Sequence, residues 1–122
     1  FWKIANYFDE EQKNNEDFIS KEFVVKNLLF HSGGVEEYKI GKFIKNLYDK
    51  VEMENKDGKR VNANSVFKII PLGIRYNDKF TIYCYGENKE KNLKEIEEFF
   101  KSIEVYPIEE IKENENNKEN NK

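Results

Sequence analysis

The sequence predicts a single small α+β domain in which a small antiparallel or mixed sheet is covered by two main helices. The clearest sign is a helical stripe of apolar residues in a Lys- and Glu-rich segment, formed by Leu93, Ile96, Phe100 and Ile103. A second sign is the strand-like run Phe80–Tyr85, which follows an Asn-Asp turn. The third is composition: 37% of the residues are charged, but 15% are aromatic, and buried rings each remove about 150–250 Å² from water. We therefore expect a folded, Phe-rich core.

The N-terminal segment predicts a short helix followed by a connector. Phe1, Ile4, Ala5 and Phe8 lie at the i, i+3, i+4 and i+7 positions of one helical face. The residues that follow are polar. Residues 1–22 are therefore expected to form an N-terminal helix and connector ahead of the main domain.

The next two segments predict a strand and a helix. Within residues 18–30, the run Phe23–Phe30 suits a buried strand closed by the turn residues His31–Gly34, which we favour. A helix capped by Gly33 is the alternative, and the apolar set that suits it is Phe18, Ile19, Phe23 and Phe30. Val35–Glu54 carries a helical stripe, which Gly41 weakens near its start. The stripe consists of Ile40, Ile44, Leu47, Tyr48 and Val51.

A β-ribbon is predicted in the middle of the chain. Val61–Tyr76 alternates in hydrophobicity and is expected to be extended, with Pro71 marking an edge, a bulge or a break. The return strand Phe80–Tyr85 is apolar or aromatic on both faces, which is typical of a central strand covered on both sides. We expect the Leu93–Ile103 segment to cover this ribbon, residues 67–85, and to leave no room for a reactive centre.

The C-terminal part predicts the helix Gly86–Ser102, a short last strand Glu104–Ile108 and a tail. Residues 109–122 are low-complexity and polar, so they are expected to be disordered. The α+β domain is thus expected over residues 23–108. Its element order is that of the βαββαβ ferredoxin-like plait, and a plain antiparallel sheet with helices on one face is the less specific form of this prediction.

Charge and cysteine content constrain the partners and leave the compartment open. The net charge is −3, from 21 basic and 24 acidic side chains, without the basic excess typical of a dedicated nucleic-acid binder. Cys84 is the only cysteine, so no disulfide forms within the chain, and cytoplasmic and exported locations are both compatible. No apolar run approaches the roughly 20 residues of a transmembrane helix.

No motif predicts catalysis, a metal site or a cofactor. His31 is the only histidine, and we interpret it as an ordinary turn residue because its sequence neighbours indicate no nucleophile–base pair. Gly33 and Gly34 occur outside any phosphate-binding motif and predict a turn. The acidic clusters lack the spacing of a calcium loop. A small enzyme based on paired carboxylates remains an alternative, since spatial pairing of the acidic residues is not visible in a sequence.

Aromatic residues provide the candidate binding surface. Rings exposed on a sheet can stack on bases, and exposed Trp and Phe are typical of protein interfaces. The candidate partner-binding residues are Trp2, Tyr76, Phe80, Tyr83 and Tyr85.

Two segments of the chain share their pattern with a known family. Phe23–Leu28 is an apolar triplet, one further residue and then Asn-Leu, and Lys79–Tyr85 is a strand-like run before a Glu-rich helix. These segments resemble the first-strand and third-strand patterns of the RNA recognition motif. The resemblance covers Phe23–Ile108 and implies a ferredoxin-like fold with RNA binding through Phe80. The sequence departs from the family at Asp78, where a basic residue belongs.

We predict a non-catalytic domain that binds another macromolecule, above all a protein, through a sheet edge or an aromatic patch. A degenerate RNA-binding domain is the first alternative, and a small carboxylate-based enzyme is the second. A positive patch beside Phe80 and Tyr83 would favour RNA binding, whereas a neutral or acidic sheet face would count against it.

Overall fold

The computed structural model describes residues 17–108, so the predicted N-terminal helix and the predicted C-terminal tail lie outside the described residues. In this range a five-stranded sheet has the order β3-β2-β4-β1-β5, and all its strand pairs are antiparallel. The strands are β1 (Phe18–Val25), β2 (Val51–Glu54), β3 (Arg60–Asn62), β4 (Lys79–Tyr85) and β5 (Val105–Pro107). The helical segments are α2 (Val35–Lys45), α3 (Val66–Ile69), the 3₁₀ turn η1 (Ile70–Leu72) and α4 (Lys89–Ser102).

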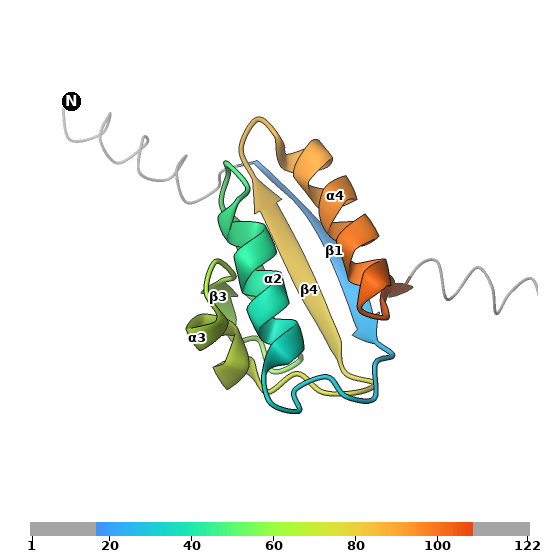
Figure 1. Ribbon diagram of the computed structural model, residues 1–122. Helices are drawn as coiled ribbons and strands as arrows, with labels where there is room; N and C mark the ends of the chain where they lie inside the picture. The colour runs from blue at the N-terminus through green and yellow to red at the C-terminus, as the bar shows by residue number, and fades with distance from the viewer. Residues whose placement is uncertain (1–16, 109–122) are drawn as a thin grey trace, which may run out of the picture.

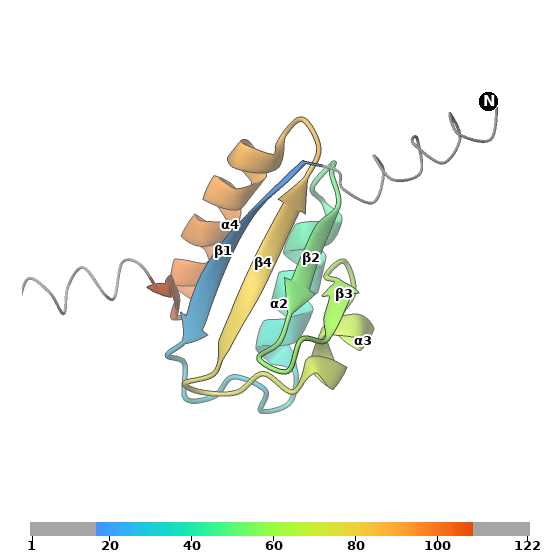
Figure 2. The same cartoon turned by 180° about the vertical axis from the view of Figure 1, so that it is seen from behind.

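The helices cover one face of the sheet. Helices α2 and α4 lie side by side in front of the strands in Figure 1, and the view from behind in Figure 2 shows the opposite face of the sheet without a helix over it. The rings of Phe43 and Phe99 stack at a centroid distance of 4.5 Å where α2 meets α4. The less specific prediction, an antiparallel sheet with helices on one face, is therefore confirmed.

The core lies between this sheet and the two long helices. Phe23 on β1, Phe80 on β4 and Phe100 on α4 are almost fully buried, and their ring centroids are 5.0–5.8 Å apart. Ile96 of α4 is also fully buried. The apolar stripe predicted for the last helix thus packs on the sheet as expected, because its 3.6-residue period places these side chains on one face.

The predicted ribbon over residues 67–85 is wrong, because residues 66–72 are helical. The side chain of Ser65 caps α3 by accepting a hydrogen bond from the Phe67 N–H at 3.2 Å. Ile69 and Leu72 are buried at helical spacing, whereas Phe67 is exposed. Pro71 lies in the first turn of η1, where its missing N–H costs no hydrogen bond. The apolar run over residues 66–72, which was predicted to be an alternating strand, instead forms α3 and η1.

The helix predicted within Val35–Glu54 does not reach the end of that segment, because residues 51–54 form a strand. Helix α2 begins at Val35 and ends at Lys45, and β2 then pairs with β4. Gly41, which was expected to weaken this helix, lies inside α2 and does not interrupt it. A Cβ atom at this position would lie 2.8 Å from the Val66 nitrogen, so glycine permits α2 to approach α3.

These differences change the connectivity. Helical turns α3 and η1 separate the β2–β3 hairpin from β4, so the ferredoxin-like order βαββαβ is not the order of this chain. Strand β1 begins at Phe18, five residues before the predicted start of the first strand. Strand β4 lies at the centre of the sheet as predicted, but its outer face is not covered by a helix of the described residues.

Candidate functional site

The loop between β1 and α2 holds the only histidine of the sequence in a fixed position. Phe30 is buried and anchors the loop in the core. The side chain of Asn27 accepts a hydrogen bond from the Leu29 N–H at 2.9 Å and donates one to the Ile103 carbonyl at 3.2 Å. His31 itself has a φ of 72°, a left-handed conformation that is uncommon for a residue with a side chain. Backbone strain of this kind is often found at functional sites.

His31 is paired with a buried acid. Its Nδ1 atom lies 2.6 Å from Oε2 of Glu37, the third residue of α2. The Glu37 side chain is 2% exposed, whereas that of His31 is 23% exposed. The other oxygen of Glu37, Oε1, is buried and has no hydrogen-bond partner among the described residues. The imidazole is thus held from the protein side and partly open to solvent.

The N-terminus of α2 lies next to this histidine. Gly34 occupies the N-cap position with a φ of 74°, and no side chain caps the helix there. The first turn of a helix presents unpaired N–H groups and a partial positive charge, which favour a bound anion. The arrangement therefore places a nitrogen nucleophile beside the positive end of a helix dipole.

Large apolar side chains are exposed in the His31 loop and on the helical elements α2, α3 and η1. A Cβ atom at Gly34 would lie 3.2 Å from Cδ1 of Ile70, so η1 contacts the loop that carries the histidine. Large exposed apolar residues are typical of protein-binding surfaces. The set that we call the His31 surface consists of Leu28, Leu29, Val35, Tyr38, Phe67 and Ile70, which are 38–84% exposed.

The predicted site residues are not gathered at one place. Trp2 lies outside the described residues. Tyr76 is 45% exposed in the loop before β4. Phe80 is 2% exposed and packs in the core, because even-numbered residues of β4 face the helices, so this ring cannot stack on a base. The RNA-binding role that the resemblance implied for Phe80 is therefore wrong.

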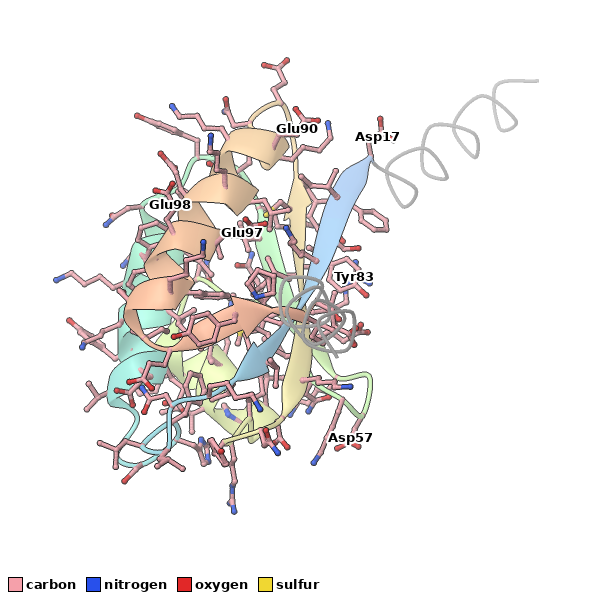
Figure 3. All side chains as sticks on the ribbon, turned by 90° about the vertical axis from the view of Figure 1, so that its right-hand side faces the viewer. Asp17, Asp57, Tyr83, Glu90, Glu97 and Glu98 are labelled. Carbon is pink, nitrogen blue, oxygen red and sulfur yellow. The ribbon has the colours of Figure 1, made fainter. Side chains whose placement is uncertain are left out.

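Tyr83 and Tyr85 do lie together, on the helix-free face of the sheet. Figure 3 shows Tyr83 on the side of the sheet away from α4. Phe18 contacts both tyrosine rings, with centroid distances of 5.4 and 5.6 Å. The guanidinium carbon of Arg60 lies 3.5 Å from the centroid of the Tyr83 ring, and Arg60 also donates a hydrogen bond to the Tyr85 hydroxyl. We call this set, with Glu52 and Glu54, the outer-face cluster.

The polar groups of the outer-face cluster satisfy one another. The Tyr83 hydroxyl donates to Glu54 at 2.7 Å, and the Tyr85 hydroxyl donates to Glu52 at 2.5 Å. The hydrogen bond to Glu54 raises the pKa of Tyr83. Burial alone would raise the pKa of Glu52, but hydrogen bonds from Tyr85 and Arg60 outweigh it and lower that pKa. Both hydroxyls and Arg60 are thus already engaged with carboxylates of this cluster, so among the described residues these three groups are not available to bind RNA phosphates.

Other reactive groups do not compete with His31. Cys84 is fully buried on the inner face of β4, and burial raises its thiol pKa to about 12. Within residues 17–108, no three His, Cys, Asp or Glu side chains are grouped so that they could hold a metal ion. Among the helices of the same range, none is long and apolar enough to cross a membrane.

The sequence interpretation missed His31 as a candidate site. Its signal was present: a single histidine, then two glycines, then an acid at the first turn of a helix. We interpreted His31 as an ordinary turn residue. A turn alone gives no reason to expect a partner for its side chain, whereas a helix that begins at Val35 brings Glu37 within hydrogen-bond distance of His31.

Comparisons with known proteins relate this chain to one family. The family model described as PTS HPr component phosphorylation site matches residues 38–102, which is 65 of the 122 residues. The matched range begins seven residues after His31. A search of curated protein sequences found no match.

Solved structures of phosphocarrier proteins are similar to the chain. The crystal structure of phosphocarrier protein HPr from Bacillus anthracis str. Ames has a TM-score of 0.55 and 25% identity, and the match covers 65% of this chain and 92% of that one. The structure of HPr-C-His from Thermoanaerobacter tengcongensis has a TM-score of 0.49 and 23% identity, over 64% and 83% of the two chains. A histidine-containing phosphocarrier protein from Mycoplasma has a TM-score of 0.49 and 14% identity, over 64% and 84%.

Proposed function

Because the chain belongs to the HPr family of phosphocarrier proteins, we propose that His31 accepts a phosphoryl group from one protein and passes it to another. The observation that carries the proposal is the position of His31. It is the only histidine of the sequence, it is partly exposed, and it lies at the N-terminus of α2. A phosphoryl group on its ring would lie near the positive end of the helix dipole, where negative charge is stabilised.

The His31 surface supports transfer between proteins. Its apolar side chains are exposed in the His31 loop and on α2, α3 and η1, and a docking partner would cover them. HPr proteins act with enzymes of the phosphotransferase system, enzyme I and the enzymes II. We propose that such enzymes bind the His31 surface in turn, so that one exposed histidine serves both the donor and the acceptor.

Transfer of a radioactive phosphoryl group tests this function. The full chain is mixed with enzyme I that carries a ³²P-phosphoryl group, and the label on the chain is measured. We expect acid-labile label on the unchanged protein and on Ser32→Ala, and none on His31→Ala. Label that persists in His31→Ala, or no label on the unchanged chain, would contradict the proposal.

A further inference from the structure

We propose that the N-terminal segment, residues 1–8, docks as a helix in the groove between α2 and α4 of its own chain. Docking of this segment is independent of the proposed phosphocarrier role. It gives a function to the apolar N-terminal face, which that role leaves unexplained.

The groove lies between the two long helices of the domain. Helices α2 and α4 lie side by side over the sheet, and a hollow of about 540 Å³ opens between them. The stacked rings of Phe43 and Phe99, together with Leu47, give this hollow its apolar lining, and all three side chains are only partly buried. The other lining residues are Asn46, Glu95 and Glu98. The groove is therefore a surface that an apolar segment can cover.

The N-terminal segment has the pattern of such an occupant. Its apolar residues Phe1, Ile4, Ala5 and Phe8 fall on one face of the predicted helix. Helices of this kind bind apolar grooves through residues at the i, i+3, i+4 and i+7 positions. A helix this short is marginal in water on its own, so its apolar face needs a surface to pack against. Residues 109–122 include a single apolar side chain and cannot provide a comparable face.

The described chain begins beside the first turn of α4. Phe18 of β1 pairs with Tyr85, the last residue of β4, and α4 begins shortly afterwards at Lys89. Figure 3 accordingly shows Asp17 and Glu90 at the same end of the molecule. The N-terminal segment therefore joins the domain at the end from which α4 starts.

The connector is long enough to bring the segment to the groove. Glu95 lies about 9 Å along α4 from Lys89, and a helix with its side chains is about 10–12 Å wide. Residues 9–16 span up to about 26–29 Å when extended, so they can pass around α4 and reach this position. The same tether keeps the segment at a high effective concentration near its own groove, which favours docking within one chain over docking on a second copy.

Charges along the route favour this path. Residues 9–17 contain five acidic side chains and one basic side chain. Lys91 and Lys94 are exposed in the first half of α4, one helical turn before the groove residues Glu95 and Glu98. Within residues 17–108 neither lysine forms an ion pair. The acidic connector would therefore pass two unpaired positive charges before the apolar segment enters the groove.

The helix-free face of the sheet is a less suitable surface for the same segment. An apolar helix placed on the outer-face cluster would bury the charged groups of Glu52, Glu54 and Arg60, which is costly. The carboxylates of the groove belong to Glu95 and Glu98, which are exposed and can stay in water while the apolar lining is covered. The groove is thus the surface that accepts the segment at the lower cost.

Trp2 reports on this docking, because it is the only tryptophan of the sequence and lies in the segment. The emission maximum and the acrylamide quenching of the full chain are measured in buffer and in urea. We expect the emission in buffer to lie at shorter wavelength, with weaker quenching, and both values to be unchanged on dilution. Emission equal to that in urea would overturn docking. A signal that is lost on dilution would show that a second copy provides the surface and would also overturn the proposal.

Two matched variants test the apolar face. Ile4→Asp places a carboxylate on that face, whereas Asn6→Asp adds the same charge on the opposite side of the predicted helix. Because docking would bury the new charge in Ile4→Asp, we expect the ratio of docked to undocked segment to fall by about tenfold or more. Asn6→Asp should match the unchanged chain. Equal quenching of Trp2 in Ile4→Asp and in the unchanged chain would overturn the proposal.

Nuclear Overhauser contacts in the isotope-labelled full chain identify the surface itself. We expect contacts from the side chains of Ile4 and Phe8 to those of Phe43, Leu47 and Phe99, and their loss in Ile4→Asp. Contacts with the outer-face cluster instead, or no contact with the groove, would overturn the proposal. None of these measurements involves a phosphoryl donor, so failure of docking and failure of the phosphocarrier role are distinguished.

Discussion

The chemistry of His31 and Cys84 is decided by their positions. Both side chains are potential nucleophiles, and each is the only one of its kind in the chain. His31 lies in a loop at a helix N-terminus and is partly exposed, whereas Cys84 faces the helices from the central strand and is fully buried. Burial disfavours the charged thiolate, which is the reactive form of cysteine. One side chain is thus available for reaction and the other is a core residue.

Alkylation should measure how accessible the Cys84 thiol is in the folded chain. Because burial raises the thiol pKa to about 12, we expect iodoacetamide to leave the folded chain unmodified at neutral pH and to modify it once in urea. Mass spectrometry counts the added groups, and a single cysteine allows at most one. Rapid modification of the folded chain would show that β4 opens easily or that the thiol is accessible.

At the scale of elements, the helices and strands that could be predicted are those whose apolar residues repeat with only one period, either that of a helix or that of a strand. Helix α4 repeats apolar residues every three or four positions among Lys and Glu, and β4 follows a turn with a run of β-forming residues. Residues 66–72 fit both periods, because nearly every position is apolar. Tertiary packing of Ile69 and Leu72 decides in favour of helical turns.

Strand β2 illustrates a second limit of sequence patterns. Val51 lies at helical spacing from Ile44 and Leu47, so the stripe of α2 appeared to continue through it. Only the pairing of β2 with β3 and β4 shows that Val51 and Met53 face the core from a strand. Short strands depend on partners distant in sequence, which a local pattern does not contain.

Two identical substitutions test the packing assigned to the helices. Phe100→Ala removes a fully buried ring between α4 and the sheet, and we expect a loss of about 3–5 kcal/mol in the free energy of unfolding. Phe67→Ala removes a ring that is 84% exposed, and we expect a change within about 0.5 kcal/mol. Urea denaturation measures both.

Phe67→Ala also reports on the His31 surface. If partners dock there, this variant should accept phosphoryl groups from enzyme I more slowly while its stability is unchanged. Equal rates for Phe67→Ala and the unchanged chain would remove Phe67 from the proposed docking surface. A large loss of stability would instead show that Phe67 packs in the core.

At the scale of the whole molecule, the two faces of the sheet differ in character. One face is covered by α2 and α4, and the other bears the outer-face cluster. Tyr83 and Tyr85 lie together on this outer face, and their hydroxyls are paired within the chain, so their role in binding a partner stays a prediction. Membership of the HPr family confirms the prediction of a chain that is not an enzyme and the prediction of protein partners. The His31 site depends on the contact between His31 and Glu37, six residues apart, and amino-acid composition does not reveal such a contact.

The outer-face cluster should make stability depend on pH. The folded pKa of Glu52 lies below its ordinary value of about 4.3, so its contribution is present above that pH and is lost as the pH falls through the folded pKa. We expect Glu52→Gln to have a lower Tm than the unchanged chain near neutral pH, and the two values to converge in acid.

Scanning calorimetry across this pH range provides the measurement. Glu95→Gln, which removes an exposed carboxylate from α4, controls for the loss of one negative charge. A constant difference in Tm between Glu52→Gln and the unchanged chain at every pH would contradict the predicted linkage.

The strand order also has a consequence for the synthesis of the chain. Strand β1 is made first among the described strands, yet it pairs only with β4 and β5, which lie more than fifty residues later. A nascent chain that has not reached Lys79 therefore exposes both edges of its first strand, and such edges invite association with other chains. The sheet can close only after nearly the whole domain has left the ribosome, so folding must be a late event.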